Sequence, residues 1–157
     1  MKKRVKTGIP GLDGLLDGGF LPGRSILLSG PCGVGKSILA MQFIYNGITK
    51  FNENGLYVSF EEEKDRIVEN MKTIGLDVKK LEKANKLIIV GGALGGISNF
   101  MEKVNAGMDH IIEEVSEIIQ KNDIKRVVID SSSLFTLLAK NNEERRKSLA
   151  RLSNKLS

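Results

Sequence analysis

The sequence is short of several residue types, and each shortage excludes a class of protein. Its single cysteine, Cys32, cannot form an internal disulfide, which indicates a reducing compartment, and we expect the cytoplasm. Tryptophan is absent and aromatic residues make up only 5% of the chain, too few to indicate a stacking surface for single-stranded nucleic acid. Apolar runs are far shorter than the roughly 20 residues of a membrane-spanning helix, so no membrane partner is expected.

What is present fits one globular domain. A chain of 157 residues is long enough to bury a substantial core. The formal net charge of +5 permits contact with nucleic acid but does not argue for it, because the basic residues gather near the two ends. Those near the C-terminal end are mixed with Glu143 and Glu144, which is the pattern of a solvated helix face. Nucleic-acid binding is therefore only a minor alternative.

The most informative motif is a glycine-rich loop at Gly30–Ser37, which matches the pattern G-x-x-x-x-G-K-[ST]. An apolar strand candidate precedes the loop and a segment with helical apolar spacing follows it, which is the context in which this pattern binds phosphate. Lys36 is expected to bind the β- and γ-phosphates of a nucleoside triphosphate, and the Ser37 hydroxyl to ligate Mg²⁺. The predicted phosphate-binding residues are Gly30, Pro31, Cys32, Gly33, Val34, Gly35, Lys36, Ser37 and Ile38.

Apolar periodicity divides the rest of the chain into alternating strands and helices. Strands are predicted at about 26–30, 56–60, 86–90 and 126–130. Helices are predicted at about 36–49, 64–74 and 98–121, from Asn142 to the end, and as short pieces near 12–16 and 78–84. The strands are β-branched and nearly continuously apolar, which is typical of a mainly parallel sheet with helices on both faces. The predicted fold class is therefore α/β, with ligands at the carboxyl ends of the strands.

Acidic residues follow two of the predicted strands, at the edge where the phosphate loop should lie. Asp130 ends the last strand, has the form of a Walker B aspartate, and is expected to hold Mg²⁺ opposite the serine of the loop. Glu61 and Glu62 follow the second strand, from which a carboxylate can orient the water that attacks a γ-phosphate. The alternative is an acidic cap on the next helix. We favour the catalytic interpretation for Glu61 and Glu62, and the cap for Glu63.

Together these motifs resemble a KaiC-like domain of the RecA-like P-loop ATPase superfamily. The matching segments follow the family's order along nearly the whole chain, so the resemblance is more specific than the loop alone. It implies an ATP-binding RecA-like core, a homo-oligomeric ring when complete, and paired glutamates that activate water. By position these are Glu61 and Glu62, which with Lys36 are the predicted catalytic residues. The segments are 7–13, 18–24, 30–37, 42–47, 60–62 and 128–131.

The resemblance also implies a single but incomplete domain over residues 1–157, with a turn-rich segment at 1–24 and a nucleotide-binding core at 25–157. RecA-like domains of this kind continue with a strand that lies between the Walker B strand and the phosphate-loop strand. Without it, both strands would have unpaired N–H and C=O groups in the middle of the sheet. We therefore expect a fragment, a truncated product, or a chain completed by another, which binds ATP better than it hydrolyses it.

The leading hypothesis is a KaiC-like regulatory ATPase that binds MgATP through a Walker A loop and, when complete, hydrolyses it slowly. One alternative is a non-catalytic ATP sensor or assembly scaffold, in which ATP controls assembly without being consumed. A second alternative is a DNA recombination or repair accessory ATPase of the RecA class, which should bind single-stranded DNA in a salt-dependent way. The expected ligands are ATP, ADP and Mg²⁺.

Overall fold

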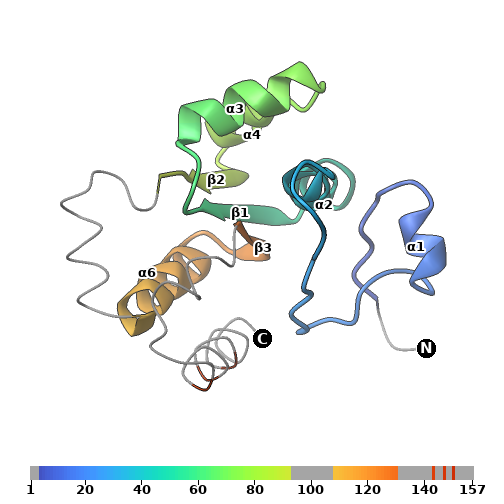
Figure 1. The fold of residues 1–157 in the computed structure, drawn as a ribbon, viewed down its shortest axis with the longest axis horizontal. Helices are drawn as coiled ribbons and strands as arrows, with labels where there is room; N and C mark the ends of the chain where they lie inside the picture. Colours follow the sequence, from blue (N-terminus) through green and yellow to red (C-terminus); the bar gives the residue numbers. More distant parts are fainter. Residues whose placement is uncertain (1–3, 93–107, 131–142, 144–146, 148–149, 151–157) are drawn as a thin grey trace.

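The computed structural model describes residues 4–92 and 108–130, and three positions beyond them, 143, 147 and 150. Figure 1 traces the chain through these elements. The helices are α1 (Leu12–Leu15), α2 (Lys36–Phe51), α3 (Lys64–Thr73), α4 (Val78–Lys83) and α6 (Met108–Lys121). The strands are β1 (Asn54–Ser59), β2 (Leu87–Val90) and β3 (Ile124–Asp130).

Most predicted elements are confirmed to within a few residues. The short helix near 12–16, the helices near 36–49, 64–74 and 78–84, and the last three predicted strands all form. The helix predicted at 98–121 is confirmed from Met108 onward. Its earlier residues, and nearly all of the helix predicted from Asn142, lie outside the described residues.

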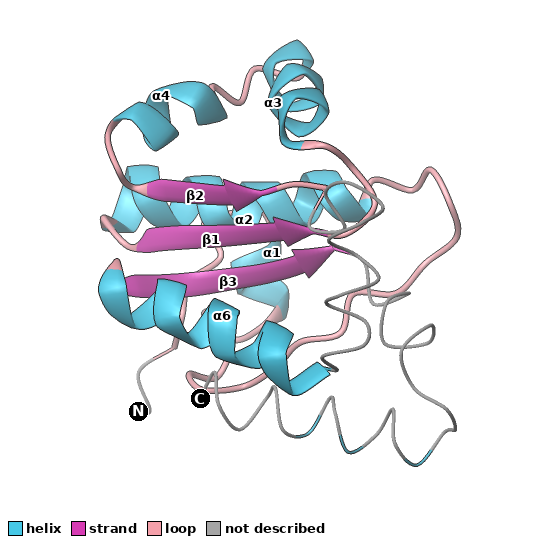
Figure 2. Cartoon of the chain, turned by 90° about the vertical axis from the view of Figure 1, so that its left-hand side faces the viewer, coloured by secondary structure: helices cyan, strands magenta, loops and turns pink. Residues whose placement is uncertain are grey.

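The three strands form a parallel sheet in the order β2-β1-β3. Because neighbouring parallel strands need long crossover connections, helices lie between them along the chain. All three arrows in Figure 2 point the same way, so the carboxyl ends of the strands meet at one edge of the sheet. In the register of the β1–β3 pair, Ser59 lies beside Asp130 at that edge. This is the edge at which the sequence predicts ligand binding.

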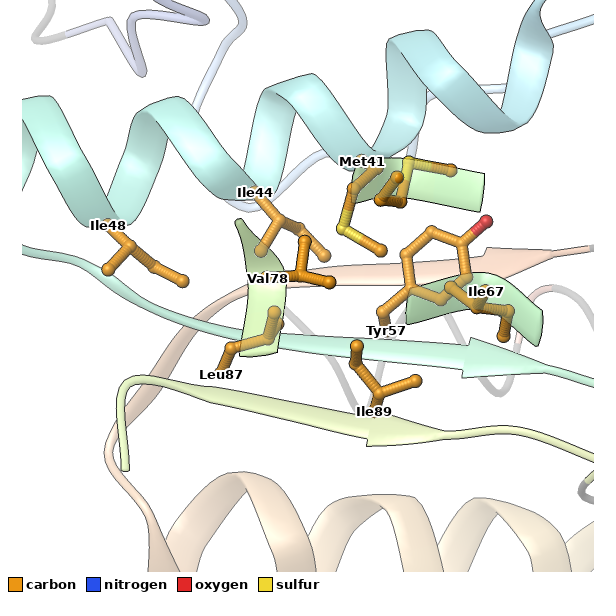
Figure 3. Close-up of a cluster of buried hydrophobic side chains, with 9 residues drawn as sticks. Met41, Ile44, Ile48, Tyr57, Ile67, Val78, Leu87 and Ile89 are labelled. Carbon is orange, nitrogen blue, oxygen red and sulfur yellow. The ribbon is translucent and has the colours of Figure 1, made fainter. Parts of the chain in front are cut away.

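Helices cover both faces of the sheet, as the apolar strands predict. On one face α2, α3 and α4 pack against β1 and β2 (Figure 3). On the other face α6 packs through Val115 against Leu56 and Val58 of β1. No helix in the described part of the chain is long and apolar enough to span a membrane. The cluster under α2 consists of Met41, Ile44, Ile48, Tyr57, Ile67, Met71, Val78, Leu87 and Ile89.

The strand predicted at about 26–30 is wrong. Residues 24–30 have no regular secondary structure, and Ile26, Leu27 and Leu28 are 55%, 80% and 42% exposed. A strand persists only where its backbone groups find partners on a neighbouring strand. Within the described residues no strand lies beside this segment, and β3 pairs only with β1. An apolar sequence without such a partner cannot form a strand.

The N-terminal segment 4–20 is held together by its own hydrogen bonds. Val5 and Phe20 form an antiparallel bridge, with N–H to O distances of 2.8 and 2.9 Å. The Asp13 carboxylate accepts hydrogen bonds from the Thr7 N–H (2.7 Å), the Thr7 hydroxyl (2.7 Å) and the Gly8 N–H (3.0 Å). Thr7 is fully buried. Since carboxylate acceptors of backbone N–H groups stabilise turns, Asp13 fixes the path of this segment.

A buried arginine ties the N-terminal segment to the sheet. Arg126 of β3 is only 2% exposed. Its guanidinium donates to the Lys6 carbonyl at 2.7 Å, to the Phe43 carbonyl at 2.8 Å and to the Glu53 carboxylate at 2.7 Å. It also lies over the Phe43 ring, 4.5 Å from the centroid. One side chain therefore joins β3, α2 and the segment before α1.

Candidate phosphate-binding site

The predicted phosphate loop leads directly into the N-terminus of α2. Gly33 and Gly35 have φ values of 81° and 86°, a left-handed conformation that glycine adopts without the strain of a side chain. Gly35 is the N-cap, and its carbonyl accepts the first helical hydrogen bond, from the Leu39 N–H at 2.9 Å. The N–H groups of the first helical turn have no acceptor within the helix, so this end of α2 favours an anion.

The side chain of Lys36 folds back over the loop. Its ammonium donates to the carbonyls of Gly30 at 3.0 Å and Pro31 at 2.8 Å. These two carbonyls lie at the start of the loop and Lys36 at its end, so the ammonium closes the loop into a ring. The loop residues Pro31 to Val34 are exposed, so a phosphate can approach from solvent.

The two predicted magnesium ligands are brought together through a third residue. The Tyr57 hydroxyl of β1 donates to Asp130 Oδ2 at 2.6 Å, and it also hydrogen-bonds the Ser37 side chain. Burial is the main cause that raises the pKa of Tyr57, and the hydrogen bond to the negatively charged Asp130 raises it further. The phenol therefore keeps its proton and acts as a donor. Ser37 and Asp130, 93 positions apart in the sequence, thus belong to one hydrogen-bonded group.

The loop after β1 carries the predicted catalytic glutamates. Glu61 is exposed and Glu62 is half-buried. The Glu62 N–H donates to the Ser59 hydroxyl at 3.0 Å, and its carbonyl accepts from the Gly92 N–H at 2.7 Å. The backbone of Glu62 is therefore fixed between the ends of β1 and β2. Its negative charge also acts on Tyr57, where it raises the pKa of the phenol, so Glu62 borders the same site.

Glu63 is the N-cap of α3, the position that the sequence predicts for it. Its side chain makes no capping hydrogen bond to the helix. Instead it lies against Gly92, where a Cβ atom would overlap the carboxylate. The backbone after β2 therefore passes close to the start of α3, because a Cβ atom at Gly91 would overlap the backbone of Glu63 and Lys64. The contribution of Glu63 to α3 is limited to its charge near the helix N-terminus.

The oxygen donors at this edge fit magnesium supplied together with a triphosphate. Within the described residues, no group of three or more His, Cys, Asp or Glu is arranged to hold a metal ion by itself. Ser37 and Asp130 offer a hydroxyl and a carboxylate, which are hard ligands. Mg²⁺ prefers hard oxygen ligands, and proteins usually hold it through one or two side chains together with substrate phosphates.

Sequence reasoning missed Tyr57, although a signal was present. It treated this tyrosine as part of an apolar strand, whereas the structure makes it the link between Ser37 and Asp130. A tyrosine within a buried strand needs a partner for its hydroxyl. That requirement, applied to a strand that ends beside the loop, indicates that the hydroxyl faces the site.

Comparison with known proteins identifies a family and several relatives of this chain. The KaiC ATPase family model matches residues 5–157. A UPF0273 protein of Thermotoga maritima is 41% identical over 137 residues, which cover 83% of this chain and 56% of that protein. The circadian clock oscillator protein KaiC of Synechococcus elongatus is 38% identical over 84% of this chain and 25% of its own length.

A solved structure gives the same result. The crystal structure of a KaiC-like protein from Pyrococcus horikoshii superposes with a TM-score of 0.82 and 32% sequence identity, over 99% of this chain and 66% of that one. The chain therefore spans a little more than half the length of the UPF0273 relative and two thirds of this structural neighbour. The predicted RecA-like α/β fold is confirmed. The chain belongs to the KaiC ATPase family.

Proposed function

We propose that this chain binds MgATP at the loop of residues 30–37. The observation that carries the proposal is the group formed at one edge of the sheet by the N-terminus of α2, Ser37 and Asp130. A helix N-terminus with glycine-rich backbone favours phosphate oxygens, and an ammonium beside it adds positive charge. Membership of the KaiC ATPase family supports adenine as the base.

In this proposal each residue of the loop edge has a separate task. Lys36 exchanges the Gly30 and Pro31 carbonyls for oxygens of the β- and γ-phosphates. Ser37 and Asp130 hold Mg²⁺, which neutralises charge on the phosphates when bound. The exchange at Lys36 needs only side-chain rotation, since the ammonium already lies at the loop.

We further propose that Glu61 and Glu62 orient the attacking water during hydrolysis. The fixed backbone of Glu62 supports this role, because a carboxylate that positions water must itself be held. The Asn70 amide donates one long hydrogen bond of 3.5 Å to the Glu62 carboxylate, which leaves the carboxylate charged. The negative charge of Glu62 near Tyr57 supports its being at the same edge as the magnesium ligands.

The proposal also covers assembly and compartment. We propose a homo-oligomer, because the resemblance to KaiC-like domains implies a ring when the domain is complete. We propose the cytoplasm as its compartment, because the single cysteine indicates a reducing environment. The relative from Synechococcus elongatus is named a circadian clock oscillator protein, and this chain matches only a quarter of it, so no clock role is carried over. Native mass spectrometry with and without MgATP tests the oligomeric state.

Single-turnover hydrolysis tests the catalytic part of the proposal. Radiolabelled ATP is bound to excess protein, and conversion to ADP is followed for the unchanged protein and for the double variant Glu61→Gln, Glu62→Gln. We expect the variant to bind MgATP normally and to lose hydrolysis at least about 100-fold, the lower end of general acid–base contributions. Glu63→Gln is the matched control and should hydrolyse ATP at the unchanged rate. Equal rates in the double variant would exclude the two glutamates as water-orienting residues.

If the unchanged protein binds ATP but leaves it intact for hours, the chain is a nucleotide sensor instead. That result would retain the binding site and reject hydrolysis. The two parts of the proposal therefore fail separately.

A further inference from the structure

Tyr57 lies at the meeting point of three elements of the candidate site. Its strand, β1, is the middle strand of the sheet, and the residue is 1% exposed. The hydroxyl donates to Asp130 Oδ2 at the end of β3, at 2.6 Å. It also hydrogen-bonds Ser37 in the first turn of α2. The phenol oxygen therefore connects the two side chains to which the proposed function gives magnesium.

The hydrogen-bonding capacity of the three groups determines how they connect. A tyrosine hydroxyl has one proton to donate and lone pairs to accept, whereas a carboxylate only accepts. Because Tyr57 gives its proton to Asp130, its bond with Ser37 is one that Ser37 donates. The Ser37 oxygen then keeps its lone pairs, and Asp130 keeps its second oxygen. Those are the atoms a hard cation would use.

The position of the hydroxyl is set by the core and not by the site. The ring of Tyr57 packs in the cluster between α2 and the sheet, beside Met41 and Ile67 (Figure 3). In that view its oxygen points out of the apolar cluster, toward the end of the sheet at which the strand arrows terminate. A tyrosine side chain has only two rotatable bonds, so close packing of the ring fixes the hydroxyl. The core thus supplies a rigid donor at the site.

We propose that Tyr57 is a positioning residue for the magnesium site. Its hydroxyl accepts a hydrogen bond from Ser37 and donates one to Asp130, and so orients the free oxygen atoms of both side chains toward one cation. This inference rests on the proposed function, since it assumes that Ser37 and Asp130 meet Mg²⁺. Removing a residue that hydrogen-bonds and orients metal ligands typically lowers metal affinity by about 10- to 100-fold.

Tyr57→Phe is the direct perturbation, because it removes only the hydroxyl and keeps the packed ring. The matched control is Tyr45→Phe. Tyr45 is the only other tyrosine of the chain and lies half-buried on α2, where its side chain makes no hydrogen bond to the other described residues. Calorimetry measures ATP affinity in EDTA and as a function of Mg²⁺ concentration for both variants and the unchanged protein.

A positioning role and a purely structural role predict different results. We expect Tyr57→Phe to raise the Mg²⁺ concentration for half-maximal enhancement of ATP binding about 10- to 100-fold, with ATP affinity in EDTA within about twofold of the unchanged protein. Tyr45→Phe should match the unchanged protein in both. An unaltered Mg²⁺ dependence in Tyr57→Phe would overturn the inference. So would an equal loss of ATP affinity in EDTA, because that indicates general damage to the fold.

A double-mutant cycle shows whether Tyr57 acts through Asp130. Asp130→Asn removes the carboxylate, so adding Tyr57→Phe should then change the Mg²⁺ requirement by less than about threefold. Full additivity of the two effects would contradict the inference. If the unchanged protein binds no ATP under any condition, the proposed function is wrong, and this inference is wrong as well. Mg²⁺-dependent binding that is the same in Tyr57→Phe rejects only the role of Tyr57.

Discussion

Replacing Arg126 should destabilise the fold more than any other single charge change in the described residues. Arg126→Met keeps an apolar chain of similar length but removes the guanidinium. That group is buried and donates to a carboxylate, Glu53, and to two backbone carbonyls, those of Phe43 and Lys6. All of these acceptors would lose a charged donor. The N-terminal segment would lose its connection to β3.

The magnitude follows from the surroundings of the guanidinium. Removing one partner of a buried ion pair costs about 3–5 kcal/mol. The Glu53 side chain is 36% exposed, so water can solvate part of its carboxylate after the guanidinium is removed. The lower end of that range therefore applies. Contact with the ring of Phe43 adds about 1 kcal/mol, and the methionine side chain recovers some packing. We expect a loss of about 3 kcal/mol in the free energy of unfolding, or roughly 6–12 °C in Tm.

Urea denaturation followed by circular dichroism measures this loss. Lys125→Met is the matched control, because Lys125 directly precedes Arg126 in β3 and its ion pair with Asp123 is largely exposed. It should change stability by less than about 1 kcal/mol. Limited proteolysis provides a second measurement, since release of the N-terminal segment should expose residues 4–20 to cleavage. A loss below about 1 kcal/mol in Arg126→Met would refute the reasoning.

Two further predictions concern the stability of the fold, one at Gly47 and one at Asp13. Gly47→Ala puts a Cβ into the space of the Arg126 side chain, so it should destabilise by about 1–3 kcal/mol despite the better helix propensity of alanine; Gly14→Ala, which meets nothing within 4 Å, should be neutral or stabilising, and urea denaturation compares them. Burial raises the pKa of Asp13, but the hydrogen bonds from Thr7 and Gly8 and the charge of Lys6 outweigh it and lower the pKa. The folded pKa is therefore below the unfolded value near 3.9, so the stabilisation is present above pH ~4 and is lost as the pH falls through the folded pKa. Unfolding curves between pH 6 and pH 3 should show a smaller decline for Asp13→Asn, and an identical decline would assign the acid sensitivity to other groups.

The sequence predicted the fold and the loop because both depend on local patterns. Apolar spacing identified α2, α3 and the three paired strands. Gly75, whose φ is 83°, marks the end of α3, as the sequence predicted. The segment at 26–30 has the same apolar character, yet forms no strand among the described residues. Local pattern cannot supply the neighbouring strand on which pairing depends. This prediction therefore failed at the step from local preference to tertiary partner.

Arg126 escaped prediction for a related reason. At the start of an apolar strand an arginine is normally solvated, and only tertiary structure reveals that α2 covers it. The sequence carried one indirect signal, Gly47, because glycine inside a helix costs about 1 kcal/mol and is kept where another group approaches closely. The Cβ that Gly47 lacks would overlap the Arg126 side chain.

The central claim is that MgATP binds at the loop of residues 30–37. Isothermal titration calorimetry of MgATP into the unchanged protein and into Lys36→Ala tests it most directly. The Lys36 ammonium should make at least two charge-assisted hydrogen bonds to phosphate oxygens, each worth about 1.5–3 kcal/mol. We therefore predict binding by the unchanged protein and a loss of at least about 100-fold in Lys36→Ala. Lys50→Ala, at the other end of α2, should leave the affinity unchanged. Equal affinity of Lys36→Ala and the unchanged protein for MgATP would contradict nucleotide binding at this loop.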